Sequence, residues 1–206
     1  MAKLFKLYEE NPNERVIFEI VAELRSGGLM IFPTDTVYSL GCDLHNTKAL
    51  KQLAKIKGVK IEKANFSFIT NSLSNLSEYV RSIDTPTYKL LKRCLPGPFT
   101  FIMRGVSKLP KPFTNKKTVG IRIPDNSIVQ AIISELGNPL AATSLKDDDS
   151  ILEYSTDPEV IFEKWEYQVA VIIDAGYGGN IPSTVVDITD AVPAVIREGK
   201  GNLDLL

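Results

Sequence analysis

Apolar residues recur at intervals of three and four positions in six stretches of the chain, and this spacing predicts amphipathic helices. In the first stretch an apolar stripe runs from Val16 to Leu24, Asn13 stands at the expected N-cap, and Gly27 follows the last turn. Pro86 and Pro158 fall in the first turn of two later helices, a position that proline favours. The predicted helices span residues 14–26, 46–57, 73–80, 85–94, 126–136 and 157–165.

Short apolar runs between these helices predict strands. The run from Leu29 to Phe32 is typical of a strand buried on both faces, and it should end before Pro33, which cannot donate to a ladder. Helices and strands alternate, but some strands follow one another directly, so we predict an α/β fold with an open, twisted mixed sheet flanked by helices. The predicted strands span residues 29–32, 66–69, 99–104, 118–123, 139–143, 169–173, 184–188 and 194–197, with a polar loop at 145–156.

Three polar residues, Thr34, Asp35 and Thr36, follow the first predicted strand. Polar groups at the end of such a strand lie on the rim of the sheet, where open α/β sheets bind ligands. Thr34 and Asp35 are equally typical of a turn closed by hydrogen bonds between side chain and backbone. The residues alone favour neither interpretation.

Composition narrows the class of protein. The length of 206 residues suits a single domain, which we place at residues 1–206, and 44% apolar with 24% charged residues is ordinary for a globular chain. No apolar run approaches the length of a membrane span, and the first residues lack the pattern of a signal peptide. Two distant cysteines, Cys42 and Cys94, indicate neither a disulfide framework nor a metal site. We therefore expect a cytoplasmic protein without a membrane partner.

Charge is distributed unevenly along the chain although the net charge is only −1. Residues 48–122 hold sixteen Lys and Arg against three acids, a balance of +13, and the rest holds eight against twenty-two, a balance of −14. This asymmetry favours an anionic partner such as a nucleotide or RNA. The alternative is that folding interleaves the two parts and cancels the field.

Common catalytic motifs do not occur in the chain. It has no GxxxxGK[S/T] sequence, its glycines at 176, 178 and 179 do not form GxGxxG, and its single histidine, His45, offers neither a triad nor a zinc cluster. What remains is hydroxyls, lysines and arginines near strand ends. Such groups suit the binding of a carboxylate and phosphates, with catalysis by positioning and charge neutralisation.

The residues Pro33 to Gly41, P-T-D-T-V-Y-S-L-G, resemble the signature of the YrdC-like family, the threonylcarbamoyl-AMP synthases. Further segments follow in the order of that family, and the resemblance covers nearly the whole chain. The start rich in Asn and Pro, Thr-Ser-Leu at 143–145 and Gly-Tyr-x-Gly from Gly176 are most similar to the YciO branch. The other segments are Lys57-Gly58, PGPFT at 96–100, GIRIP at 120–124, Ala142-Thr143-Ser144, PSTVVD at 182–187 and IREG at 196–199.

The resemblance implies a YrdC-like domain with a concave basic surface and a synthase activity. The implied substrates are L-threonine, bicarbonate and ATP, which Mg can accompany, and the products are threonylcarbamoyl-AMP, for modification of tRNA adenosine, and pyrophosphate. No tightly bound cofactor and no metal site are implied. The implied roles are catalysis for Lys57 and Ser144, substrate binding for Thr34, Tyr38, Thr143, Ser183 and Thr184, and nucleotide binding for Arg122, Arg197 and Lys60.

Each of these residues also has a structural interpretation. Tyr38 suits a half-buried core position, Lys57 suits a helix C-terminus, and Ser183 and Thr184 suit a turn that enters a strand. The two arginines favour function, because arginine inside an apolar strand pattern is rarely buried unless it is paired.

Two departures from the synthase pattern bear on activity. The synthases carry Lys-x-Arg where this chain has Lys57-Gly58-Val59, and Ser-x-Asn where it has Ser144-Leu145-Lys146. The missing arginine removes a charge and a fork of donors, so we expect weak synthase activity, with Lys60 and Lys146 as partial substitutes. Two alternatives stay open: an RNA-binding protein, for tRNA or double-stranded RNA, without synthase activity, and a paralogue that binds AMP and cleaves a related adenylate.

Overall fold

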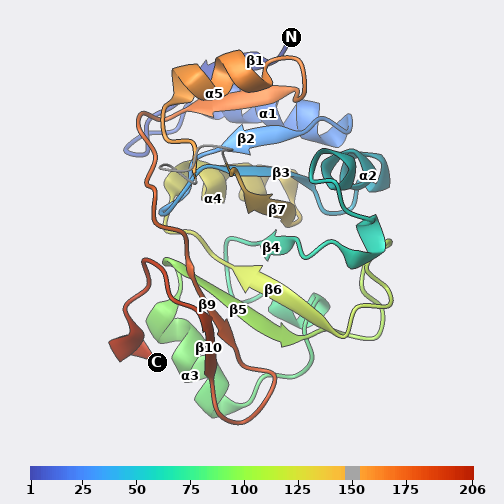
Figure 1. The fold of residues 1–206 in the computed structure, drawn as a ribbon, viewed down its shortest axis with the longest axis vertical. Helices are drawn as coiled ribbons and strands as arrows, with labels where there is room; N and C mark the ends of the chain where they lie inside the picture. The colour runs from blue at the N-terminus through green and yellow to red at the C-terminus, as the bar shows by residue number, and fades with distance from the viewer. Residues whose placement is uncertain (147–153) are drawn as a thin grey trace.

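The computed structural model describes residues 1–146 and 154–206, which form an α/β fold around one mixed sheet of ten strands (Figure 1). The strands lie in the order β1-β8-β2-β3-β7-β4-β6-β5-β9-β10. They are β1 (Lys3–Lys6), β2 (Met30–Phe32), β3 (Ser39–Asp43), β4 (Ser67–Ile69), β5 (Phe99–Arg104), β6 (Thr118–Arg122), β7 (Leu140–Ser144), β8 (Val171–Asp174), β9 (Thr184–Asp187) and β10 (Ala194–Arg197). The helices are α1 (Glu14–Arg25), α2 (Thr47–Ile56), α3 (Thr85–Cys94), α4 (Ser127–Leu136) and α5 (Pro158–Trp165).

The prediction of an open mixed sheet flanked by helices is therefore confirmed. Parallel pairs such as β4 with β6 stand beside antiparallel pairs such as β5 with β6. The polar loop predicted at residues 145–156 falls mostly on residues 147–153, which lie outside the described residues.

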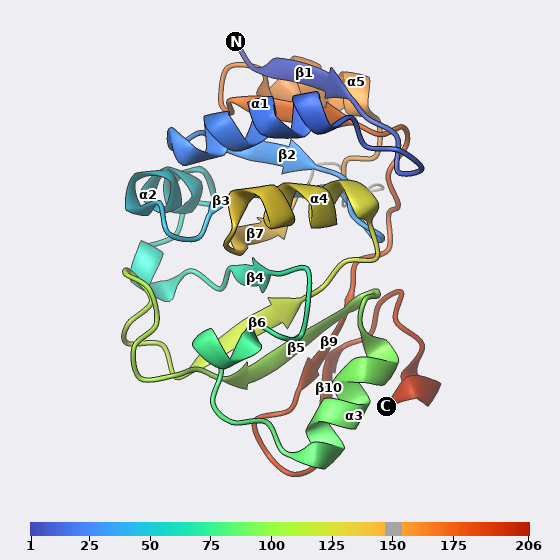
Figure 2. The same ribbon diagram turned by 180° about the vertical axis from the view of Figure 1, so that it is seen from behind.

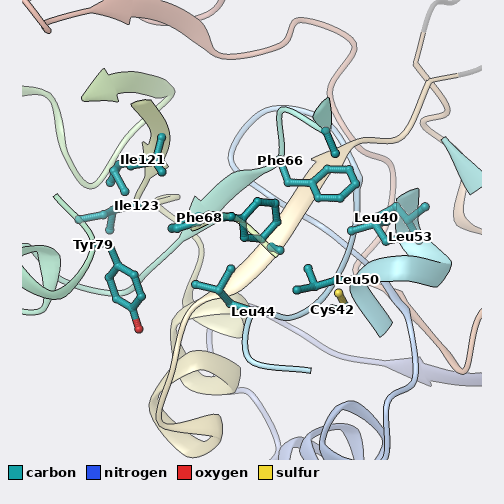
Figure 3. Close-up of a cluster of buried hydrophobic side chains, with 14 of the residues drawn as sticks. Leu40, Cys42, Leu44, Leu50, Leu53, Phe66, Phe68, Tyr79, Ile121 and Ile123 are labelled. Atoms are coloured by element: carbon teal, nitrogen blue, oxygen red, sulfur yellow. The ribbon is translucent and has the colours of Figure 1, made fainter. Parts of the chain in front are cut away.

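Side chains from the two faces of the sheet build two cores. Helices α1 and α4 lie side by side on one face, where Val21 and Ile128 belong to the same cluster as Phe32 (Figure 2). Helices α2 and α3 contribute Leu53 and Leu91 to the core on the opposite face. Figure 3 shows the middle of this second core, where Leu50 and Leu53 of α2 meet side chains of β3 and β4. Because α1 and α4 cover only part of their face, strands β4, β6, β5 and β9 leave the rest of it available for a ligand.

Helix starts are defined by polar caps. The side chains of Asn13, Asn46, Asp84, Asn126 and Asp157 each accept a hydrogen bond from a backbone N–H in the first turn of the helix that follows. Gly137, with φ of 82°, closes α4 in the left-handed conformation that glycine adopts readily.

One sequence prediction is wrong, and two strands were missed. The helix predicted over residues 73–80 is only a 3₁₀ turn, Leu76–Glu78, in a stretch whose Asn and Ser side chains compete with the backbone for hydrogen bonds. Strand β1 was not predicted, because four residues ending in lysines carry little apolar signal. Strand β3 was not predicted either, because its small residues have weak strand propensity although all five are buried.

Replacing the cap of α4 tests this account of the fold. Asn126 is buried, and its side chain accepts a hydrogen bond of 3.1 Å from the backbone N–H of Val129. We expect Asn126→Ala to lower the free energy of unfolding by about 1–2 kcal/mol in urea unfolding. Asn13→Ala removes an exposed cap of α1 and serves as the milder control. An Asn126 variant no less stable than the Asn13 variant would contradict the account.

Candidate functional site

A cavity opens on the part of the sheet that α1 and α4 leave uncovered. Its volume is about 350 Å³, which is typical of a small-molecule site. In the ladder, Ser67 lies opposite both Ala142 and Gly120, and Gly120 lies opposite Ile102, so these side chains share one face. Ala142, Ser67 and Gly120 are small, which leaves space above this part of the sheet. The lining consists of Ser39, Asn65, Phe66, Ser67, Phe68, Ile69, Thr100, Ile102, Lys116, Thr118, Val119, Gly120, Arg122, Ala142, Thr143, Ser144, Lys146, Ser183, Val185 and Arg197.

The charge of the cavity is positive. Lys116, Arg122, Lys146 and Arg197 line it, and none of the described residues in its wall is acidic. Ser and Thr residues of the same wall supply neutral hydroxyl groups. A concave wall of one sign focuses the electrostatic field, so the cavity favours an anionic ligand.

Arg122 is held at one end of the cavity by the turn that follows β2. Its Nη2 donates to Asp35 Oδ1 at 2.5 Å, to Thr36 Oγ1 at 2.6 Å and to Thr34 Oγ1 at 3.0 Å. Thr34 Oγ1 also donates to the Val37 carbonyl at 2.7 Å, which closes the turn. Residues 34–36 thus form the predicted turn and also position an arginine of the cavity wall. The two interpretations of these residues, as a turn and as part of the sheet rim, are therefore compatible.

Burial determines the electrostatics of this arginine. The side chains of Arg122 and Asp35 are only 5% and 9% exposed. Burial lowers the pKa of Arg122, the Asp35 carboxylate acts against this shift, and nearby Arg197 adds to it. Arg122 Nε and Asp35 Oδ2 are buried without a hydrogen-bond partner among the described residues.

Arg197 and Ser183 meet at the neighbouring part of the wall. Arg197 Nη2 donates to the Ser183 carbonyl at 2.8 Å, and the Ser183 and Thr100 hydroxyl oxygens are 2.8 Å apart. The ladder places Arg197 opposite Val185 and Val185 opposite Thr100, so strands distant in the sequence bring these groups together. Arg122 is paired with Asp35, but Arg197 adds a further positive charge near Arg122, which an anion would neutralise.

Two further lysines, Lys146 and Lys57, lie in or near the wall of the cavity. Lys146 lines the cavity, with its Nζ 5.7 Å from the centre of the Tyr154 ring. Lys57, at the C-terminus of α2, does not line the cavity, but burial and the charge of Lys146 lower its pKa. Lys57 therefore lies near Lys146 but outside the wall of the cavity.

The structure brings five of the predicted site residues to one cavity, namely Arg122, Thr143, Ser144, Ser183 and Arg197. Thr34 contacts this group through Arg122. Lys60, which is exposed, does not line the cavity, and neither does Lys57.

Two residues that were predicted to bind substrate, Tyr38 and Thr184, form hydrogen bonds to the backbone. The Tyr38 hydroxyl donates to the Gly176 carbonyl at 2.8 Å and accepts from the Ala175 N–H, and burial raises the pKa of Tyr38 to about 12. The Thr184 hydroxyl donates to the Gly201 carbonyl and accepts from the Gly199 N–H. Neither residue lines the cavity. Their observed contacts are those of residues that hold loops in place.

Sequence reasoning did not assign Lys116, Thr100 or Ser67 to the site, although each lines the cavity. It left Asp35, which holds Arg122, open between a turn and a binding rim. Lys116 Nζ donates to Asn65 Oδ1 at 2.8 Å, and burial lowers its pKa. Gly120 inside a predicted strand was the available signal, because glycine in a strand often marks the close approach of a ligand.

The fold and this cavity define an α/β protein with an anion-favouring site on its sheet. A model of the Sua5/YciO/YrdC family, described as "Telomere recombination", matches residues 22–199. The chain therefore belongs to the Sua5/YciO/YrdC family.

Three relatives show the range of similarity within the family. Escherichia coli "Uncharacterized protein YciO" is 38% identical over 205 residues, 98% of each chain, and its crystal structure matches with a TM-score of 0.90 over 100% of this chain and 99% of that chain. The threonylcarbamoyl-AMP synthase of Bacillus subtilis is 30% identical over 194 residues, 93% of this chain but 55% of the synthase. The crystal structure of P. abyssi Sua5 complexed with L-threonine is 27% identical, with a TM-score of 0.84 over 96% of this chain and 58% of Sua5. The chain thus spans little more than half of these two longer proteins.

Within residues 1–146 and 154–206, no group of His, Cys, Asp and Glu side chains could hold a metal ion. No helix of this part of the chain is both long and apolar enough to cross a membrane.

Removing the carboxylate that faces Arg122 tests the geometry. We expect Asp35→Ala to lower the free energy of unfolding by about 3–5 kcal/mol, because it leaves a buried guanidinium without its counter-charge. Asp190→Ala is the matched control, since it breaks the Arg104–Asp190 pair, in which Asp190 is 84% exposed. Denaturant unfolding of both variants measures the difference, and equal effects would contradict the geometry.

Proposed function

We propose that this protein is a threonylcarbamoyl-AMP synthase of low activity, with L-threonine, bicarbonate and ATP as substrates. The observation that carries the proposal is the cavity in which Arg122 and Arg197 converge with hydroxyl groups from several strands. Relatives named threonylcarbamoyl-AMP synthase and a Sua5 structure complexed with L-threonine support it.

The proposed chemistry needs charge neutralisation more than proton transfer. The amino group of threonine and bicarbonate form a carbamate and water, and a carbamate oxygen then attacks the α-phosphorus of ATP. The bond from that phosphorus to the bridging oxygen breaks, and pyrophosphate leaves with the electron pair. Arginine suits the carboxylate and phosphate groups of these substrates, because its planar fork binds them bidentately and keeps its charge. In the proposal ATP is a substrate and no resident cofactor takes part.

The two departures from the synthase pattern lie in different surroundings. Val59 is 43% exposed and does not line the cavity. Because valine is apolar, it supplies none of the charged donors that the arginine of the synthases would bring. Lys146 lines the cavity and brings a cation where the synthases have a neutral asparagine. In this proposal the chain retains the positive cavity but differs in the donors available when pyrophosphate leaves, and this difference accounts for slow turnover.

Calorimetric titration tests the nucleotide part of the proposal. We expect Arg197→Ala to weaken AMP and ATP binding by about tenfold or more, because it removes a charged hydrogen bond near the ligand. Lys57→Ala should have a smaller effect, since Lys57 lies outside the cavity wall. Lys111→Ala removes an exposed lysine that does not line the cavity and is the control. Unchanged affinity in the Arg197 variant would refute the assignment.

Restoring the synthase residues tests the reaction itself. The double variant Val59→Arg/Lys146→Asn should release pyrophosphate about tenfold faster than the native protein, if one charged hydrogen bond in the transition state is regained. The measurement is pyrophosphate release that depends on both threonine and bicarbonate, with omission of each as control. The native protein is incubated in parallel with the adenylate product, and both directions are followed by chromatography. No gain in the variant, together with cleavage of the adenylate, would favour the adenylate-cleaving alternative.

A further inference from the structure

A second hollow, of about 490 Å³, lies beside the cavity where β5 ends and β6 begins. Lys116 and Thr118 line both hollows, so the two adjoin along one short stretch of β6 and the residues before it. The charged residues in its wall are Arg81, Arg104, Lys116 and Lys117. We call this hollow the basic groove. No step of the proposed reaction uses Arg81, Arg104 or Lys117.

Backbone pairing brings the cations of the basic groove together. The N–H of Arg81 donates to the carbonyl of Arg104 at 2.9 Å, beside an isolated bridge between Val80 and Gly105. The N–H of Gly105 donates to the carbonyl of Lys117 at 2.9 Å. Three positions far apart in the sequence are thereby fixed as neighbours by backbone hydrogen bonds.

The two guanidinium groups are also oriented by the backbone. Arg81 Nε donates to the Gly105 carbonyl at 3.3 Å, and Arg104 Nε donates to the Thr189 carbonyl at 2.8 Å. Each Nε contact restricts the guanidinium plane, so less rotamer freedom is lost when the Nη groups bind a ligand. Arg104 Nη2 also contacts Asp190 Oδ1 at 3.1 Å, but Asp190 is 84% exposed.

The balance of charge in the basic groove is strongly positive. Four cations line it, while none of its described lining residues is acidic and only the exposed Asp190 pairs with one of them. Exposed pairs of this kind contribute little. Like charges fixed this close repel one another, and an anion with several charged oxygens would relieve the repulsion.

We propose that the basic groove is a second anion site, which binds a small anion with two or more phosphate groups, of the class of inorganic pyrophosphate. The two arginine forks and two lysines suit a ligand with several phosphate oxygens better than a single carboxylate. Binding of this anion does not depend on the proposed function. Only the further step, that pyrophosphate released in the cavity moves past Lys116 into the basic groove, rests on it.

The test is calorimetric titration of the full chain with inorganic pyrophosphate at fixed ionic strength. We expect Arg81→Gln/Lys117→Gln to weaken binding to the basic groove by about tenfold or more. Lys108→Gln/Lys111→Gln removes the same number of charges at exposed positions outside the basic groove, in the connection that also carries Lys117, and should leave affinity within about twofold. Arg197→Ala impairs the cavity and should leave binding to the basic groove intact. Lys117→Gln alone, at an exposed position, provides a second variant if the double variant does not fold.

Several results would overturn the proposal. Native affinity in the Arg81→Gln/Lys117→Gln variant would do so, as would loss of pyrophosphate binding in Arg197→Ala alone, which would place the anion in the cavity. Binding of a short RNA duplex without binding of pyrophosphate would instead make the basic groove a nucleic-acid surface. Failure of the proposed function is separate, because it appears as absent threonine-dependent pyrophosphate release and does not change this titration.

Discussion

The buried ion pair between Arg122 and Asp35 is the constraint on which the site depends. Asp35 follows β2 and Arg122 ends β6, and in the sheet the strands β3, β7 and β4 lie between them. A guanidinium buried this deeply is costly unless a carboxylate and further acceptors surround it, and Thr34 and Thr36 supply those acceptors. The turn after β2 therefore holds the cation of a distant strand at the edge of the cavity.

The space for a ligand comes from small residues in register. Gly120, Ser67 and Ala142 lie side by side across three strands, and a Cβ added at Gly120 would approach Ser67 Oγ to 3.3 Å. Larger side chains in this row would extend into the cavity. The cations of the cavity come from β6, β10 and the residues beside β6 and β7. Small residues in the middle of this sheet face therefore leave space for a ligand, and positively charged side chains line that space.

The sequence predicted most elements, because their signals are local. Apolar spacing and caps such as Asn126 define the helices, and Arg122 could be assigned to a site because a buried arginine in an apolar strand needs a partner. The same reasoning does not explain Arg197, because all four residues of β10 are exposed. Lys116 could not be assigned, because only strand register and the fold of its connection place it at the cavity. The sequence also could not show that the Tyr38 hydroxyl binds the carbonyl of Gly176, 138 positions away in the sequence.

The central claim is that Arg122, held by residues 34–36, and Arg197 together receive an anionic group of the ligand. A crystal structure of the protein soaked with AMP and L-threonine tests this claim most directly. The account predicts a phosphate or carboxylate within hydrogen-bond distance of both guanidinium groups, with the Arg122–Asp35 pair intact. A ligand bound away from both arginines, or an Arg122 that leaves Asp35 to reach it, would contradict the account.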